Sequence, residues 1–213
     1  FFTGSLMTAL SQGYMLGLYI VGLETTLWTF AFAILCAAFL AVGYSYIGAA
    51  WLIIKTSDTL QRKAVEWARG GIWGLVLGIG AISLASPFVS PRIFDKWFSF
   101  PELLLLAPLP IMSLVLIAAL WIALQNLPTQ NDRFAWVPFL AGAGLFTLSF
   151  AGLAYSFYPY IVPEKLTIFE AASAPEALSI ILVGTLFVLP TIGGYTVLSY
   201  YIFRGKAREL RYD

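Results

Sequence analysis

The segment WTFAFAILCAAFLAVGYSYIGAAWLII, residues 28–54, contains no charged residue. It is longer than the roughly 20 apolar residues that an α-helix needs to cross about 30 Å of hydrocarbon at 1.5 Å per residue. Its apolar residues do not alternate with polar ones, as the strands of a transmembrane barrel would require. The segment therefore predicts a membrane-spanning helix, which satisfies its own backbone hydrogen bonds in lipid.

Five more apolar blocks flank this segment. Hydrophobic residues make up 60% of the 213 residues and charged residues 11%, with a mean hydropathy of +0.86, whereas soluble domains carry about 25% charged residues. The pattern predicts an all-α polytopic membrane protein, a bundle of about six transmembrane helices in one membrane domain over residues 1–213. The predicted helices cover residues 1–23, 28–54, 70–89, 103–125, 134–161 and 177–203.

Lys and Arg residues are distributed unevenly between the predicted connections. Nine lie on one side and three on the other, and such a bias places the richer side in the cytoplasm. The C-terminus is therefore predicted to be cytoplasmic. The net charge of +1 gives no basic field for nucleic acid. The richer side holds Lys55, Arg62, Lys63, Arg69, Arg133, Arg204, Lys206, Arg208 and Arg211, and the other holds Arg92, Lys96 and Lys165.

Residues that carry chemistry in membranes are missing from the predicted spans. The chain has no His, and no Asp, Glu, Lys or Arg lies inside the six blocks, so the segment predicts neither a conventional proton pathway nor a His-ligated haem site. Met7, Met15 and Met112 are interpreted as packing residues, not as axial ligands. No catalytic, cofactor-binding or metal-binding residue is assigned. Aromatic crevices leave contact with a quinone or a lipid tail open.

Small residues recur four apart on three of the predicted helices, which allows helices to approach closely in lipid. We interpret these stripes as packing within the bundle, with a seam to a partner subunit as the alternative. Prolines inside the fourth and sixth predicted helices are expected to kink them. The stripes are Ala9, Gly13 and Gly17, then Ala37 and Ala41, then Gly70, Gly74 and Gly78, and the prolines are Pro108, Pro110 and Pro190.

Four stretches together resemble subunit II of cytochrome bd-type quinol oxidases, including the cyanide-insensitive type. The third stretch also predicts an N-cap at Ser173 with Glu176 completing a capping box, and Glu170 departs from the amide or Asp of the family pattern. Order, spacing and predicted sidedness agree along the chain. The stretches are GSLMTALSQG (4–13), GAAWLIIKT with LQRKA (48–56 and 60–64), PEKLTIFEAAS (163–173), and Pro190 with Tyr195 and YYIFRGK (200–206).

The resemblance implies a nine-helix subunit of a bacterial cytoplasmic membrane complex, of which this chain would be the C-terminal two-thirds, with three preceding helices absent. It implies a partner, subunit I, that holds haems b and d, or b only, and that oxidises quinol while O2 is reduced to water. Small accessory subunits, lipid and quinone are further implied partners. This chain would then have a structural role, shielding the oxygen-reducing site, and the connection 24–27 is shorter than the family pattern.

Two other classes of function remain open from the residues alone. One is half of a permease with an apolar substrate site between helices, although coupled transporters usually carry an intramembrane charge. The other is a lipid-scaffolding subunit without an oxidase partner. Haem and a second large subunit in the purified complex would distinguish both from an oxidase subunit.

Overall fold

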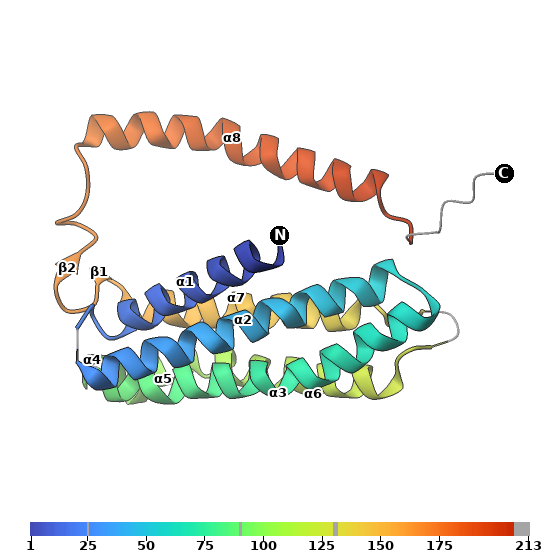
Figure 1. Cartoon of the computed structure of the whole chain (residues 1–213). Helices are drawn as coiled ribbons and strands as arrows, with labels where there is room; N and C mark the ends of the chain where they lie inside the picture. Colours follow the sequence, from blue (N-terminus) through green and yellow to red (C-terminus); the bar gives the residue numbers. More distant parts are fainter. Residues whose placement is uncertain (25, 90, 130–131, 207–213) are drawn as a thin grey trace.

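The computed structural model describes residues 1–24, 26–89, 91–129 and 132–206 (Figure 1). These residues are overwhelmingly helical, with one short hairpin that joins α7 to α8. The elements are α1 Phe2–Ile20, α2 Leu27–Lys55, α3 Asp58–Val89, α4 Pro91–Phe98, α5 Glu102–Leu106, α6 Pro108–Asn126, α7 Val137–Phe157, β1 Tyr160–Val162, β2 Leu166–Thr167 and α8 Pro175–Ile202.

Five helical segments within the described part of the chain are long and apolar enough to cross a membrane. They are Leu27–Lys55, Asp58–Ala85, Glu102–Asn126, Val137–Phe157 and Pro175–Ile202. Each overlaps one of the predicted blocks, and the remaining block contains α1, a 19-residue helix that is not among the five. The prediction of an all-α polytopic membrane protein is confirmed.

Several predicted boundaries were wrong for local physical reasons. Helix α3 begins at Asp58, not at residue 70, so the basic segment up to Arg69 is helix and not a loop. Asp58 lies in its first turn, where a carboxylate interacts favourably with the helix dipole. The predicted helix 103–125 is divided, because α5 ends before Ala107 and Pro108 begins α6. Proline at the first helical position needs no N–H donor.

The helix ends near the hairpin also differ from prediction. Helix α7 ends at Phe157, not at 161, and the hairpin follows. The capping box predicted at Ser173 and Glu176 does not form, since the N-cap of α8 is Ala174 and makes no side-chain cap hydrogen bond. A capping box is found instead on α2, where Thr26 and Thr29 exchange side-chain to backbone bonds, satisfying N–H groups that the helix leaves without partners.

Helix α2 is the centre of the bundle and packs against α1, α3 and α7. Its buried Tyr46 donates a hydrogen bond to the Pro138 carbonyl, 2.9 Å away. A Cβ on Gly13 would lie 2.5 Å from the Cα of Ala37, and one on Gly74 would lie 2.4 Å from Val42 Cγ1. Gly13 and Gly74 therefore pack against α2 inside the chain, as the internal-packing interpretation predicted, because a glycine leaves room for the Ala37 backbone in one case and for the Val42 side chain in the other.

Helix α8 lies apart from the other helices, beyond α1 (Figure 1). No residue of α8, which the structure describes in full, is buried. The helix continues through Pro190. It is joined to the bundle by the hairpin at one end and by the residues after Ile202 at the other, so what holds it in place lies at its ends.

Candidate functional site

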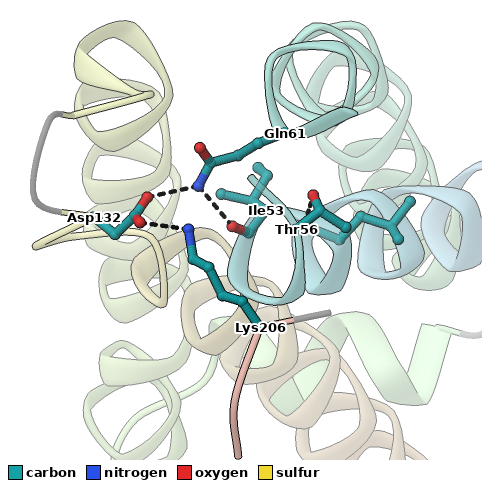
Figure 2. A network of polar contacts seen from close by, with 6 residues as sticks. Ile53, Thr56, Gln61, Asp132 and Lys206 are labelled. Atoms are coloured by element: carbon teal, nitrogen blue, oxygen red, sulfur yellow. Dashed lines mark hydrogen bonds and ion pairs between the residues drawn. The ribbon is translucent and has the colours of Figure 1, made fainter. Parts of the chain in front are cut away.

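A polar cluster joins four segments, which are the end of α2, the start of α3, the α6–α7 connection and the residues after α8 (Figure 2). We call this region the basic end, because it carries Lys55, Arg69 and Lys206. It brings together two of the four stretches that were quoted from the sequence, 48–64 and 200–206. In the sequence their cations counted only toward the positive-inside bias, whereas the structure gives Lys55 and Lys206 specific partners.

Gln61 is the buried centre of the cluster. Its amide Nε2 donates to the Ile53 carbonyl at 3.0 Å and to Asp132 Oδ1 at 2.6 Å, although the side chain is only 5% exposed. Thr56 is also buried, and its hydroxyl donates to the Leu52 carbonyl at 2.7 Å. Buried polar groups are costly unless hydrogen-bonded, so Gln61 fixes the turn between α2 and α3 against the α6–α7 connection.

Asp132 receives both a neutral and a charged donor. Lys206 forms an ion pair with Oδ2, opposite the bond from Gln61 to Oδ1. These two hydrogen bonds, that from Lys206 first, lower the pKa of the Asp132 carboxyl, while partial burial opposes the shift. Sequence reasoning missed Asp132; the available signal was a carboxylate next to Arg133, on the side of the predicted topology that holds nine of the twelve Lys and Arg residues. Its contacts attach the segment after α8 to the bundle.

Lys55 makes a second attachment between α2 and the end of α8. Its Nζ donates to the Phe203 carbonyl and, at 3.4 Å, to the Gly205 carbonyl. The same ammonium lies 5.1 Å from the centre of the Trp51 ring, which in turn packs edge to face with Tyr200. The positive charge of Lys55 interacts favourably with the dipole at the end of α2. The same ammonium also provides a hydrogen-bond donor to carbonyls after α8.

Arg69 makes a similar attachment between α3 and the end of α6. Its Nε donates to the Leu124 carbonyl at 2.9 Å, and Nη2 donates to the Leu127 carbonyl at 3.1 Å. The last carbonyls of a helix have no partner within the helix. Arg69 therefore attaches α3 to the end of α6.

The opposite end of the bundle is held by the hairpin stretch 163–173. Lys165 Nζ donates to the Gly22 carbonyl at 2.7 Å, in the turn after α1 where Gly22 has a left-handed φ of 69°. Glu170 accepts the Thr167 N–H and hydroxyl, each at 2.8 Å, and these bonds lower the pKa of its carboxyl. The residue that departs from the family pattern thus stabilises a turn.

The first stretch, 4–13, lies on α1 and faces α2. Tyr44 donates its hydroxyl to Gln12 Oε1 at 2.9 Å, and Gly13 is the close contact to Ala37 described above. Each of the four stretches therefore contributes at least one contact between elements distant in sequence. None of these contacts brings a nucleophile and a base together.

A model of the family described as cytochrome bd terminal oxidase subunit II matches residues 1–203 of the chain. The chain belongs to the cytochrome bd terminal oxidase subunit II family. The resemblance predicted from the four stretches is confirmed. A search of curated proteins gave no match.

A cytochrome bd subunit II belongs to a respiratory quinol oxidase complex that contains haems. There is no His in the sequence, and Met7 and Met15 lie eight positions apart on α1, or about 12 Å along its axis, too far to ligate one iron together. Within the described ranges no group of three or more His, Cys, Asp or Glu side chains could hold a metal ion.

Proposed function

We propose that this chain is a non-haem supporting subunit that packs against the haem-bearing subunit I of a terminal quinol:O2 oxidoreductase. The match to the subunit II family over residues 1–203 carries the proposal. The haem subunit supplies the chemistry, which is oxidation of quinol and reduction of O2 to water. Small accessory subunits and quinone belong to the same proposal as further partners.

Helix α8 is the surface that best supports a subunit contact. Large apolar side chains are exposed along it, including Leu182, Leu186 and Leu189, each at least 60% exposed. Both ends of the helix are attached, by Lys165 at the hairpin and by Lys206 at the basic end. A partner helix can therefore meet an apolar surface whose position is already fixed, which lowers the entropic cost of association.

The role proposed for the residues of this chain is to exclude water and protons from the redox centre and to hold the helices in position. The six apolar blocks contain no Asp, Glu, Lys, Arg or His, and we expect them to keep water and protons away from a neighbouring redox centre. The polar residues lie at the two ends, where they hold helices to one another. We assign no catalytic residue and no cofactor ligand to this chain.

The proposal includes an orientation in a bacterial cytoplasmic membrane. With nine of twelve Lys and Arg at the basic end and the tail, the positive-inside bias puts the C-terminus in the cytoplasm. Protease added to intact cells is then expected to cut within residues 164–176 and to spare residues 55–69. Cleavage confined to residues 55–69 would reverse the orientation.

The supporting role is tested by purifying this chain with and without its co-purifying partners. Haem absorbance and quinol oxidation are expected only in the preparation that retains a second large subunit. The expectation follows from the lack of a ligand pair for iron in this chain. Stoichiometric haem absorbance in the subunit alone would falsify the proposal.

A further inference from the structure

A groove between α3 and α6 opens on the outside of the bundle. Its volume is about 460 Å³, and its walls are almost entirely apolar. Trp73 and Trp121 pack edge to face across it, with ring centres 5.3 Å apart. It is lined by Ile72, Trp73, Val76, Leu114, Ile117, Ala118, Trp121 and Ile122.

The groove lies within a membrane span and near the basic end. Its residues on α6 extend from Leu114 to Ile122, which is about 12 Å along the helix, and α6 ends shortly after, at Asn126. Ile72 is 2% exposed and forms the floor, whereas Trp73 and Ile122 are more than half exposed on the rims. The groove therefore begins about one helical turn before the last residue of α6.

Arg69 does not line the groove, but it precedes Trp73 by one helical turn on α3, on the side of the groove nearest the basic end. Its guanidinium is held by the Leu124 and Leu127 carbonyls at the end of α6, and the residue remains exposed. The other charged residues on the preceding part of α3 are Asp58, Arg62, Lys63 and Glu66, whose charges cancel. Arg69 therefore gives the stretch 58–69 its net charge of +1. Asp132, the carboxylate of the nearby connection, is paired with Lys206.

The geometry points to a binding site for an anionic phospholipid, with one acyl chain in the groove and the phosphate beside Arg69. A helix of a partner subunit could cover the same groove with apolar side chains, but such a contact brings no negative charge to Arg69. A quinone tail fits the apolar groove but brings no negative charge to Arg69. Basic residues at such a level attract anionic lipid headgroups.

The test is lipid retention by the purified complex, measured by native mass spectrometry after exchange with equal amounts of phosphatidylglycerol and phosphatidylcholine. The wild-type subunit is expected to retain one phosphatidylglycerol with about a fivefold preference, the factor that one basic residue near a membrane surface provides. Ala118→Trp fills the groove and should abolish retention. Ala31→Trp, at an exposed position on α2, is the matched control and should leave retention unchanged.

The charge of Arg69 is tested independently of the groove, which keeps the site testable should Ala118→Trp fail to fold. Arg69→Lys keeps the positive charge and should retain the preference for phosphatidylglycerol, whereas Arg69→Gln should reduce it to near unity. Equal retention of the two lipids by the wild type, unchanged retention in Ala118→Trp, or a bound quinone in place of phospholipid would overturn the assignment. None of these readouts depends on oxidase activity.

Discussion

Helices α2 and α8 are nearly equal in length and apolarity, yet they have opposite surroundings. They contain 29 and 28 residues, and the most apolar window of each has a mean hydropathy of 2.0. Within that window 33% of the α2 residues are buried inside the chain, against none of those in α8. Apolar composition therefore makes both helices stable in lipid, but it does not decide which of them gains protein neighbours.

Shape separates the two helices, because lipid offers apolar side chains as much contact as another helix does. Glycines of α1 and α3 approach α2 closely, as Gly13 does at Ala37 and Gly74 at Val42. On α8, a Cβ at Gly184 or Gly193 would meet, within 4 Å, no atom of another helix in the described part of the chain. Close backbone approach, rather than hydrophobicity, assembles the bundle.

The largest expected effect is on the α1–α2 contact. Gly13→Leu must displace backbone, since its Cβ would lie 2.5 Å from Ala37 Cα and 2.8 Å from the Cys36 carbonyl oxygen. Overpacking of this kind costs about 3 kcal/mol. Gly184→Leu on α8 is the matched control and should leave unfolding unchanged. The measurement is the free energy of unfolding of the subunit in micelles, and similar losses in both variants would refute the distinction between the helices.

A smaller effect on stability is expected from removing one tyrosine hydroxyl from α2 or from α8. Tyr46→Phe leaves the buried Pro138 carbonyl without its donor, which costs about 1 to 3 kcal/mol. Tyr195→Phe on α8 removes a hydroxyl from a side chain that is 72% exposed and should change the stability little. Thermal unfolding of both variants sharpens the comparison, and an equal shift in midpoint would contradict it.

The smallest effect concerns the attachment of α8 at the basic end. The pKa of Asp132 is lowered in the folded chain, first by the hydrogen bond from Lys206. A carboxyl with a lowered folded pKa stabilises the fold above its unfolded pKa of about 3.9, and the stabilisation is lost as the pH falls through the folded pKa. Because Asp132 is 35% exposed, solvent screening limits the effect to a fraction of about 1 kcal/mol.

Asp132→Asn should therefore accelerate amide hydrogen exchange at residues 203–206 at neutral pH. The wild type should show the same acceleration only in acid, below about pH 4. Asp95→Asn, at an exposed position on the other end of the bundle, serves as the control. Unchanged exchange in Asp132→Asn would mean that the ion pair does not hold the end of α8.

The sequence by itself determined that the chain is a set of membrane helices and located them to within a few residues in most cases. The physical reason is local: in lipid each backbone polar group must find a partner inside its own segment, so a long apolar block can only be a helix. Boundaries set by charge or proline were harder, as α3 and the α5–α6 break illustrate. Helix α3 extends into the charged residues before its apolar block, and α5 ends inside an apolar block. Hydropathy alone indicates neither boundary.

Only the tertiary structure decided which residues meet. Lys206 and Asp132 are 74 positions apart in the sequence. Lys55 is 148 positions from Phe203, whose carbonyl it contacts. Nothing in either local pattern distinguishes such a pair from two membrane anchors, because the pairing depends on the path of every helix between them. The same holds for the groove beside Arg69, whose walls come from α3 and α6. Local sequence fixes whether a residue can enter the membrane, and packing fixes what it contacts there.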